Sequence, residues 1–317
     1  MKSKIIYIVG GGHSGSTLLS LLIGSSDNVF SLGEVYYFNS YNDPVSDPEL
    51  FSVFKNQCTC GEIFGECEFW SKVNKMFDKP VTITRKISIF EFVKTIWNMI
   101  SPFKDLFQFK LANGDDKYFF NAIETVVMDF NKKCDYLIDS SKDPRRLARL
   151  KELVGVENIF VIHLIRDGRG YVASYNSKNK PRAREWGLKV ENFFITGVKW
   201  MAINIITRMY LKKYQFQAIQ ISYDLFCRNP QNYINVLNER LNLNISKQYI
   251  KKINNSVYHD IHGNWMRHKK IKAIQYDGSW KKDLSLSKRI VLTALLSPVN
   301  KRFVLHDSVT RSINKTK

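Results

Sequence analysis

The sequence predicts an α/β fold in which a central parallel sheet lies between two layers of helices, forming a three-layer sandwich. The first observation is a set of short apolar segments typical of buried parallel strands, at residues 5–10, 28–34, 136–141, 159–167 and 217–224. The second is that helical patterns fit between them, for instance 144–153, where Pro144 suits the first helical turn. Alternating strands and helices produce a parallel sheet with helices on both faces. Ligands of such sheets bind at the carboxyl ends of the strands.

The chain has 317 residues, enough for one large α/β domain or two small ones, and we predict a single domain over residues 1–317. Within it we expect a helical insertion at about 70–132 and a C-terminal loop that closes over a ligand at about 255–285. Residues 86–112 are rich in Phe, Ile and Trp with interspersed lysines. They are interpreted as an amphipathic cap, or as a lid or membrane-surface helix.

The charge balance is strongly basic, with 48 Lys and Arg against 29 Asp and Glu, a formal net charge of +19. Such a surface favours anionic partners, although a lysine surplus that serves only solubility is the alternative. No known nucleic-acid-binding motif is present, so no nucleic-acid partner is predicted. Neither a signal peptide nor an apolar run of the roughly 20 residues that span a membrane is visible. We therefore expect a cytoplasmic protein, with peripheral contact at the inner membrane face left open.

Three of the five cysteines, Cys58, Cys60 and Cys67, cluster in CTCGEIFGECEFW, while Cys134 and Cys227 stand alone. A closed zinc site needs four ligands, and no histidine lies near these cysteines in the sequence. The sequence therefore favours a local disulfide or ordinary packing of these cysteines, and no metal site is predicted.

A glycine-rich loop, GGGHSGST at residues 10–17, follows the first strand and permits three interpretations. Gly10, Gly12 and Gly15 match the dinucleotide-binding pattern G-x-G-x-x-G, with Glu34 near the place of the ribose-binding acid. The same residues match a P-loop except that Ser16 replaces the lysine that contacts the β- and γ-phosphates. A kinase or ATPase without this lysine would lose its main positive charge at the phosphates.

In the third interpretation of this P-loop-like sandwich, the loop binds a terminal phosphate at the positive end of the following helix. Ser14, Gly15, Ser16 and Thr17 supply backbone N–H groups and hydroxyls there. The residue before them, His13, would lean over the group that is transferred.

A second motif, HLIRDGRGYVASYNS at 163–177, ends a strand with Arg166 and continues into a helix that carries Ser174. Together with the loop, it resembles the PAPS-dependent sulfotransferases, especially the bacterial, carbohydrate and tyrosylprotein members. In that family, a 5′-phosphosulfate loop precedes a 3′-phosphate segment with an arginine and a serine. A nucleotide with a 3′-phosphate needs a second cationic site, which a bidentate guanidinium suits. The alternatives are a structural ion pair for Arg166 and a helix-surface position for Ser174.

Several further segments resemble the same family in the same order. They are CTCGEIFGECEFW (58–70), IDSSKDPRR (138–146), ISYDLFCRNP (221–230) and HDIHGNWMRHKKIKAIQYDGSW (259–280). The resemblance thus covers roughly residues 1–300. One departure is that His13 stands where the family has Lys or Arg, and a neutral imidazole is a weaker electrostatic catalyst than a fixed cation.

The resemblance implies roles for individual residues in sulfuryl transfer. Glu34 is the predicted base, with a ribose contact or helix cap as the alternative. Lys142 and protonated His13 are the candidates for stabilising charge on the bridging oxygen, although Lys142 would otherwise only screen a helix entrance. The predicted nucleotide ligands are Gly12, His13, Ser14, Gly15, Ser16, Thr17, Arg166, Ser174, Tyr223 and Arg267.

Two of these predicted nucleotide ligands have an alternative interpretation without a role in binding. Tyr223 would flank the adenine or else be a core tyrosine, and Arg267 would close over the 3′-phosphate or else belong to a solvated charge run. His163 is interpreted as a structural histidine within its strand. The resemblance implies PAPS as the co-substrate and no required metal.

The predicted function is therefore transfer of a sulfuryl group from PAPS to an acceptor hydroxyl, most favourably on a carbohydrate or glycolipid, with release of PAP. The alternatives are a P-loop kinase or NTPase, and a catalytically inactive module that binds an anion or glycan.

Overall fold

The computed structural model describes residues 2–38, 57–76, 114–176, 192–305 and 307–309. The segment 86–112 lies outside the described residues. Among those described, no helix is both long and apolar enough to cross a membrane.

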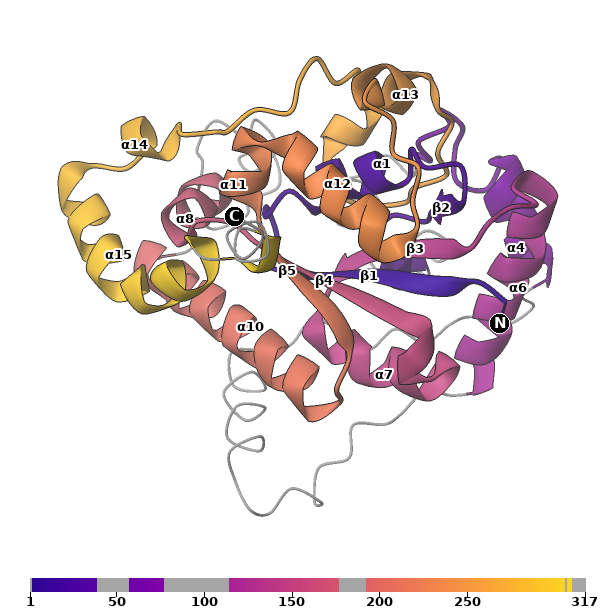
Figure 1. Cartoon of the computed structure of the whole chain (residues 1–317), viewed down its shortest axis with the longest axis horizontal. Helices are drawn as coiled ribbons and strands as arrows, with labels where there is room; N and C mark the ends of the chain where they lie inside the picture. The colour runs from indigo at the N-terminus through magenta and orange to yellow at the C-terminus, as the bar shows by residue number, and fades with distance from the viewer. Residues whose placement is uncertain (1, 39–56, 77–113, 177–191, 306, 310–317) are drawn as a thin grey trace.

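A five-stranded parallel sheet forms the centre of the fold, in the order β2-β3-β1-β4-β5 (Figure 1). Its strands are β1 (Lys4–Gly10), β2 (Val29–Ser31), β3 (Tyr136–Lys142), β4 (Ile159–Ile165) and β5 (Gln217–Ser222). β1 pairs with β3 on one side and β4 on the other, with Ile5 opposite both Leu137 and Ile159. The chain runs from β1 towards β2 but from β4 towards β5, so the topological switch point lies between β1 and β4.

The side chains of β1 point alternately to the two faces of the sheet and pack into a hydrophobic core on each face. Ile6 and Ile8 pack into a core with α1 (Ser16–Ile23), α12 (Pro230–Leu241) and α13 (Tyr249–Asn255). Ile5, Tyr7 and Val9 pack into a separate core with α7 (Pro144–Val154) and α10 (Phe193–Lys213). Figure 1 shows these two helical layers on opposite sides of the strands. Successive side chains of a strand point to opposite faces, so one apolar run supplies both cores.

Two further hydrophobic clusters lie beyond the two ends of the sheet. Figure 1 shows the helices that contribute to them. Beside β2 and β3, helices α4 (Glu68–Met76) and α6 (Gly114–Phe130) bury an aromatic cluster that includes Phe38, Phe69 and Trp70. At the other end, Trp200 and Trp280 pack with α8 (Gly168–Tyr175) and α15 (Leu286–Val299). The remaining elements are η1 (Val35–Tyr37), η3 (Val156–Asn158), α11 (Tyr223–Arg228), η4 (Trp265–His268), α14 (Trp280–Asp283) and a π-helical turn, η5 (Asn300–Val304).

The structure confirms the predicted fold class, and it places every predicted strand within about three residues of its predicted ends. The largest difference is β2, which ends at Ser31 rather than at Glu34. The helix predicted at 144–153 spans Pro144–Val154, with Pro144 at its first position and the Asp143 side chain accepting from Arg145 N.

Candidate functional site

The glycine-rich loop joins the carboxyl end of β1 to the N-terminus of α1, as the sequence predicts. Gly15 caps this helix with φ 91°, and a Cβ at this position would lie 2.2 Å from the ring of Tyr223. A side chain is therefore excluded both by the backbone conformation and by space. A Cβ on Gly12 would meet nothing within 4 Å among the described residues, so this part of the loop has an open side.

The start of α1 is arranged to receive an anion. The first N–H groups of a helix have no intrahelical acceptor, and they lie at the positive end of its dipole. The Ser14 hydroxyl next to them is 2% exposed and has no hydrogen-bond partner among the described residues. Ser16 and Thr17 are also buried, and Thr17 Oγ1 accepts a hydrogen bond from Asn264 N at 3.1 Å. A buried hydroxyl without a protein partner costs free energy unless a ligand supplies one.

Arg166 reaches the loop from the end of β4, the neighbouring strand across the switch point. Its Nη1 donates to the carbonyl oxygen of His13 at 3.2 Å, and its Nη2 lies 2.7 Å from Asp277 Oδ2. The guanidinium also lies 5.4 Å from the centroid of the Tyr223 ring. Arg166 is buried, and its Nε has no hydrogen-bond partner among the described residues. The structure therefore brings together three residues named from distant motifs: His13, Arg166 and Tyr223.

On the opposite side of the loop, Glu34 forms the centre of a buried charged group. Lys142, at the end of β3, forms an ion pair with Glu34 Oε1. His262 Nδ1 lies 2.9 Å from Glu34 Oε2. A Cβ on Gly263 would lie 3.2 Å from both Glu34 Oε1 and Thr17 Oγ1, so this triad of Glu34, Lys142 and His262 borders the first turn of α1.

The triad has a defined charge. Burial by itself raises the pKa of Glu34, but Lys142 and His262 outweigh this effect and lower the pKa to about 2. Burial lowers the pKa of His262, against the opposing effect of the Glu34 carboxylate. Lys142, whose charge is the larger of the two lowering effects, and His262 together keep Glu34 ionised.

Backbone strain is concentrated in the same place. Five non-glycine residues in the described part of the chain have positive φ, and three of them, His13, Lys142 and His262, belong to this site. Left-handed backbone at a non-glycine residue costs free energy and occurs preferentially at functional sites.

Arg267 holds the loop that carries His262. Its Nη1 donates to the carbonyl oxygens of His262 and Gly263, and its Nη2 donates to that of Gln57 at 3.0 Å. The structure thus places Arg267 on the Glu34 side of the site, among backbone carbonyl groups. Its role as a 3′-phosphate ligand stays a prediction.

The other predicted residues are placed as follows. Ser174 lies half-buried in the last turn of α8, which begins two residues after Arg166. His13 forms an edge-to-face contact with Tyr175, with ring centroids 5.6 Å apart. His163 Nε2 lies 3.0 Å from Asn204 Oδ1, and burial lowers its pKa to about 4. This environment agrees with the structural role predicted for His163.

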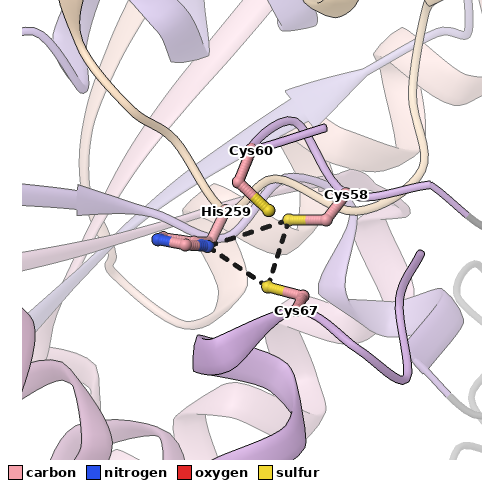
Figure 2. Close-up of side chains that lie close together, drawn as sticks. All are labelled: Cys58, Cys60, Cys67 and His259. Carbon is pink, nitrogen blue, oxygen red and sulfur yellow. Dashed lines mark hydrogen bonds between the residues drawn. The ribbon is translucent and has the colours of Figure 1, made fainter. Parts of the chain in front are cut away.

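Two histidines were missed by the sequence analysis, His262 in the triad and His259 beside the cysteines. Figure 2 shows Cys58, Cys60, Cys67 and His259 converging, with ligand atoms within 4.8 Å of one another. No histidine lies near these cysteines in the sequence, but the fold places His259, 192 residues after Cys67, in contact with it. Of the two alternatives favoured from the sequence, a local disulfide or ordinary packing, the disulfide is not formed, since all five cysteines are free. The segment HDIH at 259–262 was the available signal.

Comparison with known proteins identifies the fold. No protein-family model and no curated protein sequence matches the chain. A solved sulfotransferase domain from the curacin biosynthetic pathway matches 94% of this chain and 98% of that domain, with a TM-score of 0.54 and 15% identity. The match to the sulfotransferase STF9 from Mycobacterium avium covers 96% of this chain and 77% of the STF9 chain, with a TM-score of 0.46 and 11% identity. The likeness to the curacin-pathway domain shows that this chain has the sulfotransferase fold.

Proposed function

We propose that the protein is a sulfotransferase that moves the sulfuryl group of PAPS to an acceptor hydroxyl and releases PAP. The observation that carries this proposal is the pair of buried anion-binding groups at the switch point. One is the start of α1 with the unpartnered Ser14 hydroxyl, and the other is Arg166 with its unpartnered Nε. A nucleotide with phosphate groups at both its 5′ and 3′ positions needs two such groups, whereas ATP or NAD needs only the first.

The glycine-rich loop would hold the 5′-phosphosulfate, and Arg166 with Ser174 would hold the 3′-phosphate. Gly12 lets a phosphate approach the backbone, and Gly15 lets Tyr223 pack directly on the loop. We assign Tyr223 to the wall between the two phosphate sites, because its ring contacts both Gly15 and Arg166. No metal is needed for this charge balance, since the helix dipole and the guanidinium supply it.

In the reaction, the bond between sulfur and the bridging phosphate oxygen breaks while the acceptor oxygen forms its bond to sulfur. The acceptor proton passes to the Glu34 carboxylate. Lys142 stabilises the charge that develops on the bridging oxygen of departing PAP. Positioning and charge balance are the protein's main contributions, because the transferred group resembles free SO₃.

The Glu34–Lys142 ion pair suggests how the base is activated. With Lys142 in contact, the pKa of Glu34 is about 2, so the carboxylate is a poor proton acceptor. If Lys142 turns towards the bridging oxygen when PAPS binds, the largest of the effects that lower the pKa of Glu34 is removed, and the pKa rises from about 2. One movement of Lys142 would thus strengthen the base and stabilise the leaving group. His262, hydrogen-bonded to Oε2, would hold the carboxylate in position meanwhile.

The acceptor is proposed to be a carbohydrate or glycolipid hydroxyl. This preference is supported by the resemblance to carbohydrate sulfotransferases and by the net charge of +19, which suits an acceptor that is already anionic. Incubation of the purified protein with PAPS and a panel of glycans, glycolipids and peptides tests the proposal, with PAP release as the readout. PAP release that depends on one acceptor class supports it.

The closed Glu34–Lys142 ion pair also supports a second candidate, a catalytically inactive module that binds PAP or another anion. Tight PAP binding without PAP release, across the whole acceptor panel, would favour this candidate. Binding of Mg²⁺–ATP in place of PAP would instead favour a kinase or NTPase.

A further inference from the structure

Three thiols and an imidazole meet beside the β2 edge of the sheet (Figure 2). Cys58 and Cys60 lie on a short turn, Cys67 comes directly before α4, and His259 follows α13. We propose that these four residues bind a structural zinc ion. The proposal does not depend on the proposed enzymatic function.

The distances between the side chains suit a tetrahedral ion. Cys67 Sγ lies 3.3 Å and Cys58 Sγ 3.8 Å from His259 Nδ1, and the two sulfur atoms are 3.5 Å apart. Ligands 2.3 Å (sulfur) and 2.0–2.1 Å (nitrogen) from zinc at tetrahedral angles are about 3.8 Å apart for two sulfurs and about 3.5 Å for sulfur and nitrogen. A disulfide requires about 2.05 Å between sulfurs, so these thiols are arranged around a point rather than bonded as a pair.

The donor set and its burial indicate the kind of metal site. Thiolate and imidazole ligands in a compact group select zinc among the common divalent ions. Cys58, Cys67 and His259 are buried and Cys60 is half-buried. Because the protein supplies all four ligands, no coordination position is left for a substrate. The site is therefore structural rather than catalytic.

The backbone around the thiols is already shaped for binding. Gln57 and Ile63 form an antiparallel bridge, and Cys58 N donates to Glu62 O at 3.0 Å, which folds the turn that carries two of the cysteines. Gly61 adopts φ 101° within this turn. A tight turn with glycine directly after the second cysteine brings the two thiols to the same side.

The histidine is fixed independently of the thiols. The carbonyl oxygen of His259 accepts from Trp70 Nε1 at 2.7 Å, and its ring stacks on Phe30 with centroids 6.0 Å apart. Phe69 and Phe130 lie 5.4 and 5.3 Å from the same ring. An apolar shell of this kind keeps water away from the ligands and fixes their orientation.

The zinc would connect two segments that shape the Glu34 side of the candidate site. His259 is three residues from His262, and between them Ile261 O accepts from Glu34 N at 2.8 Å. Asp260 N donates to Thr59 Oγ1 at 2.7 Å, and Arg267 reaches Gln57, so the cysteine turn and this segment already touch. The ion would thus hold the segment that presents His262 to Glu34.

The test is the metal content of the full-length protein, purified without chelator and analysed by elemental mass spectrometry. We expect about one zinc per chain, and loss of at least about nine-tenths of it in Cys67→Ser and in His259→Ala. Cys134→Ser is the matched control, because Cys134 is also a buried thiol but lies outside the cluster. Wild-type protein without zinc would overturn the proposal, as would Cys67→Ser protein that folds and keeps its zinc.

A second measurement covers the case in which the variants do not fold. Wild-type protein exchanged into Co²⁺ should show the intense thiolate charge-transfer band and the visible bands of a tetrahedral ion. His259→Cys should keep about one metal ion per chain and change the cobalt spectrum to that of an all-thiolate site. An octahedral cobalt spectrum, or peptide mapping that finds Cys58 and Cys67 joined as a disulfide, would contradict the proposal.

Discussion

The two sides of the glycine-rich loop differ in how their charges are satisfied. On the β3 side, Glu34 is paired with Lys142 and hydrogen-bonded to His262. On the β4 side, Arg166 contacts His13 and Asp277 but keeps a buried Nε without a partner among the described residues. On the first side the opposite charges of Glu34 and Lys142 are already paired, whereas on the second side the Nε of Arg166 is left for a ligand to contact. The difference suggests that chemistry resides on the β3 side and nucleotide affinity on the β4 side.

The largest expected effect comes from Glu34→Gln. It removes the proposed base without changing the size of the side chain, and we expect turnover to fall by about 100-fold or more. PAP affinity, measured by calorimetry, should change by less than about threefold, since the substitution leaves the proposed phosphate ligands Ser14 and Arg166 unchanged. Glu68→Gln, which removes an exposed acid on α4, is the control. A loss of PAP affinity as large as the loss of turnover would contradict the assignment of chemistry to the β3 side and nucleotide affinity to the β4 side.

The next effect is on stability. Lys142→Met leaves Glu34 buried without its cation, which we expect to cost about 3 kcal/mol of unfolding free energy at pH 7. In the wild type, the pKa of Glu34 is lowered to about 2. Ionised Glu34 therefore contributes fully to the unfolding free energy above the pKa that it has in the unfolded chain, and this contribution is lost as the pH falls towards 2. In Lys142→Met the largest of the lowering effects is gone, so we expect the pKa of Glu34 to be higher than in the wild type.

The difference between the two proteins should therefore shrink as the pH falls from about 5 towards 3, measured by urea unfolding. A difference that stays constant over this range would mean that Glu34 and Lys142 do not interact as the structure indicates. Glu34→Gln combined with Lys142→Met should recover part of the lost stability, because no charge is then left buried.

A smaller effect is expected from Arg166→Ala. It should weaken PAP binding at least about tenfold, or ~1.4 kcal/mol, because the proposed 3′-phosphate loses a charge-assisted hydrogen bond. Arg166→Lys should restore only part of this affinity, since an ammonium cannot form a bidentate contact. Arg289→Ala, which removes a half-buried arginine on α15, serves as the control. Unchanged PAP binding in Arg166→Ala would show that the nucleotide does not bind at the end of β4.

The smallest and most discriminating effect compares two buried serines of the same segment. The Ser14 hydroxyl has no partner among the described residues, whereas Ser20 Oγ lies 2.9 Å from Ser31 Oγ. Ser14→Ala should weaken PAP binding by about 1 kcal/mol and leave unfolding free energy nearly unchanged. Ser20→Ala should do the reverse, which urea unfolding and calorimetry together would detect. Equal effects of both substitutions on stability would show that Ser14 is structural.

The sequence predicted the sheet, the loop and Arg166 because these depend on local patterns. An apolar run followed by glycines, and an arginine at the end of a strand, each indicate a position in an α/β fold without further information. The Glu34–Lys142 ion pair was less accessible. Both residues were named, but their contact depends on β2 and β3 being neighbours.

His259 and His262 were not predicted, because their partners lie about 200 residues earlier in the chain. Spacing rules for metal sites consider ligands that are close in sequence, so a fourth ligand from a distant loop is invisible to them. Arg267 was predicted from the resemblance of its loop to the C-terminal loop of the family, which does not reveal that its donors point to backbone carbonyl groups.

The central claim is that the glycine-rich loop and Arg166 form one site for a nucleotide with a 3′-phosphate. Calorimetric titration of the purified protein with PAP, beside Mg²⁺–ATP, 5′-AMP and NADH, tests it most directly. We expect PAP to bind at micromolar concentration or tighter, about −8 kcal/mol, without added metal, and the other three to bind much more weakly. Binding of Mg²⁺–ATP or NADH with no binding of PAP would contradict it.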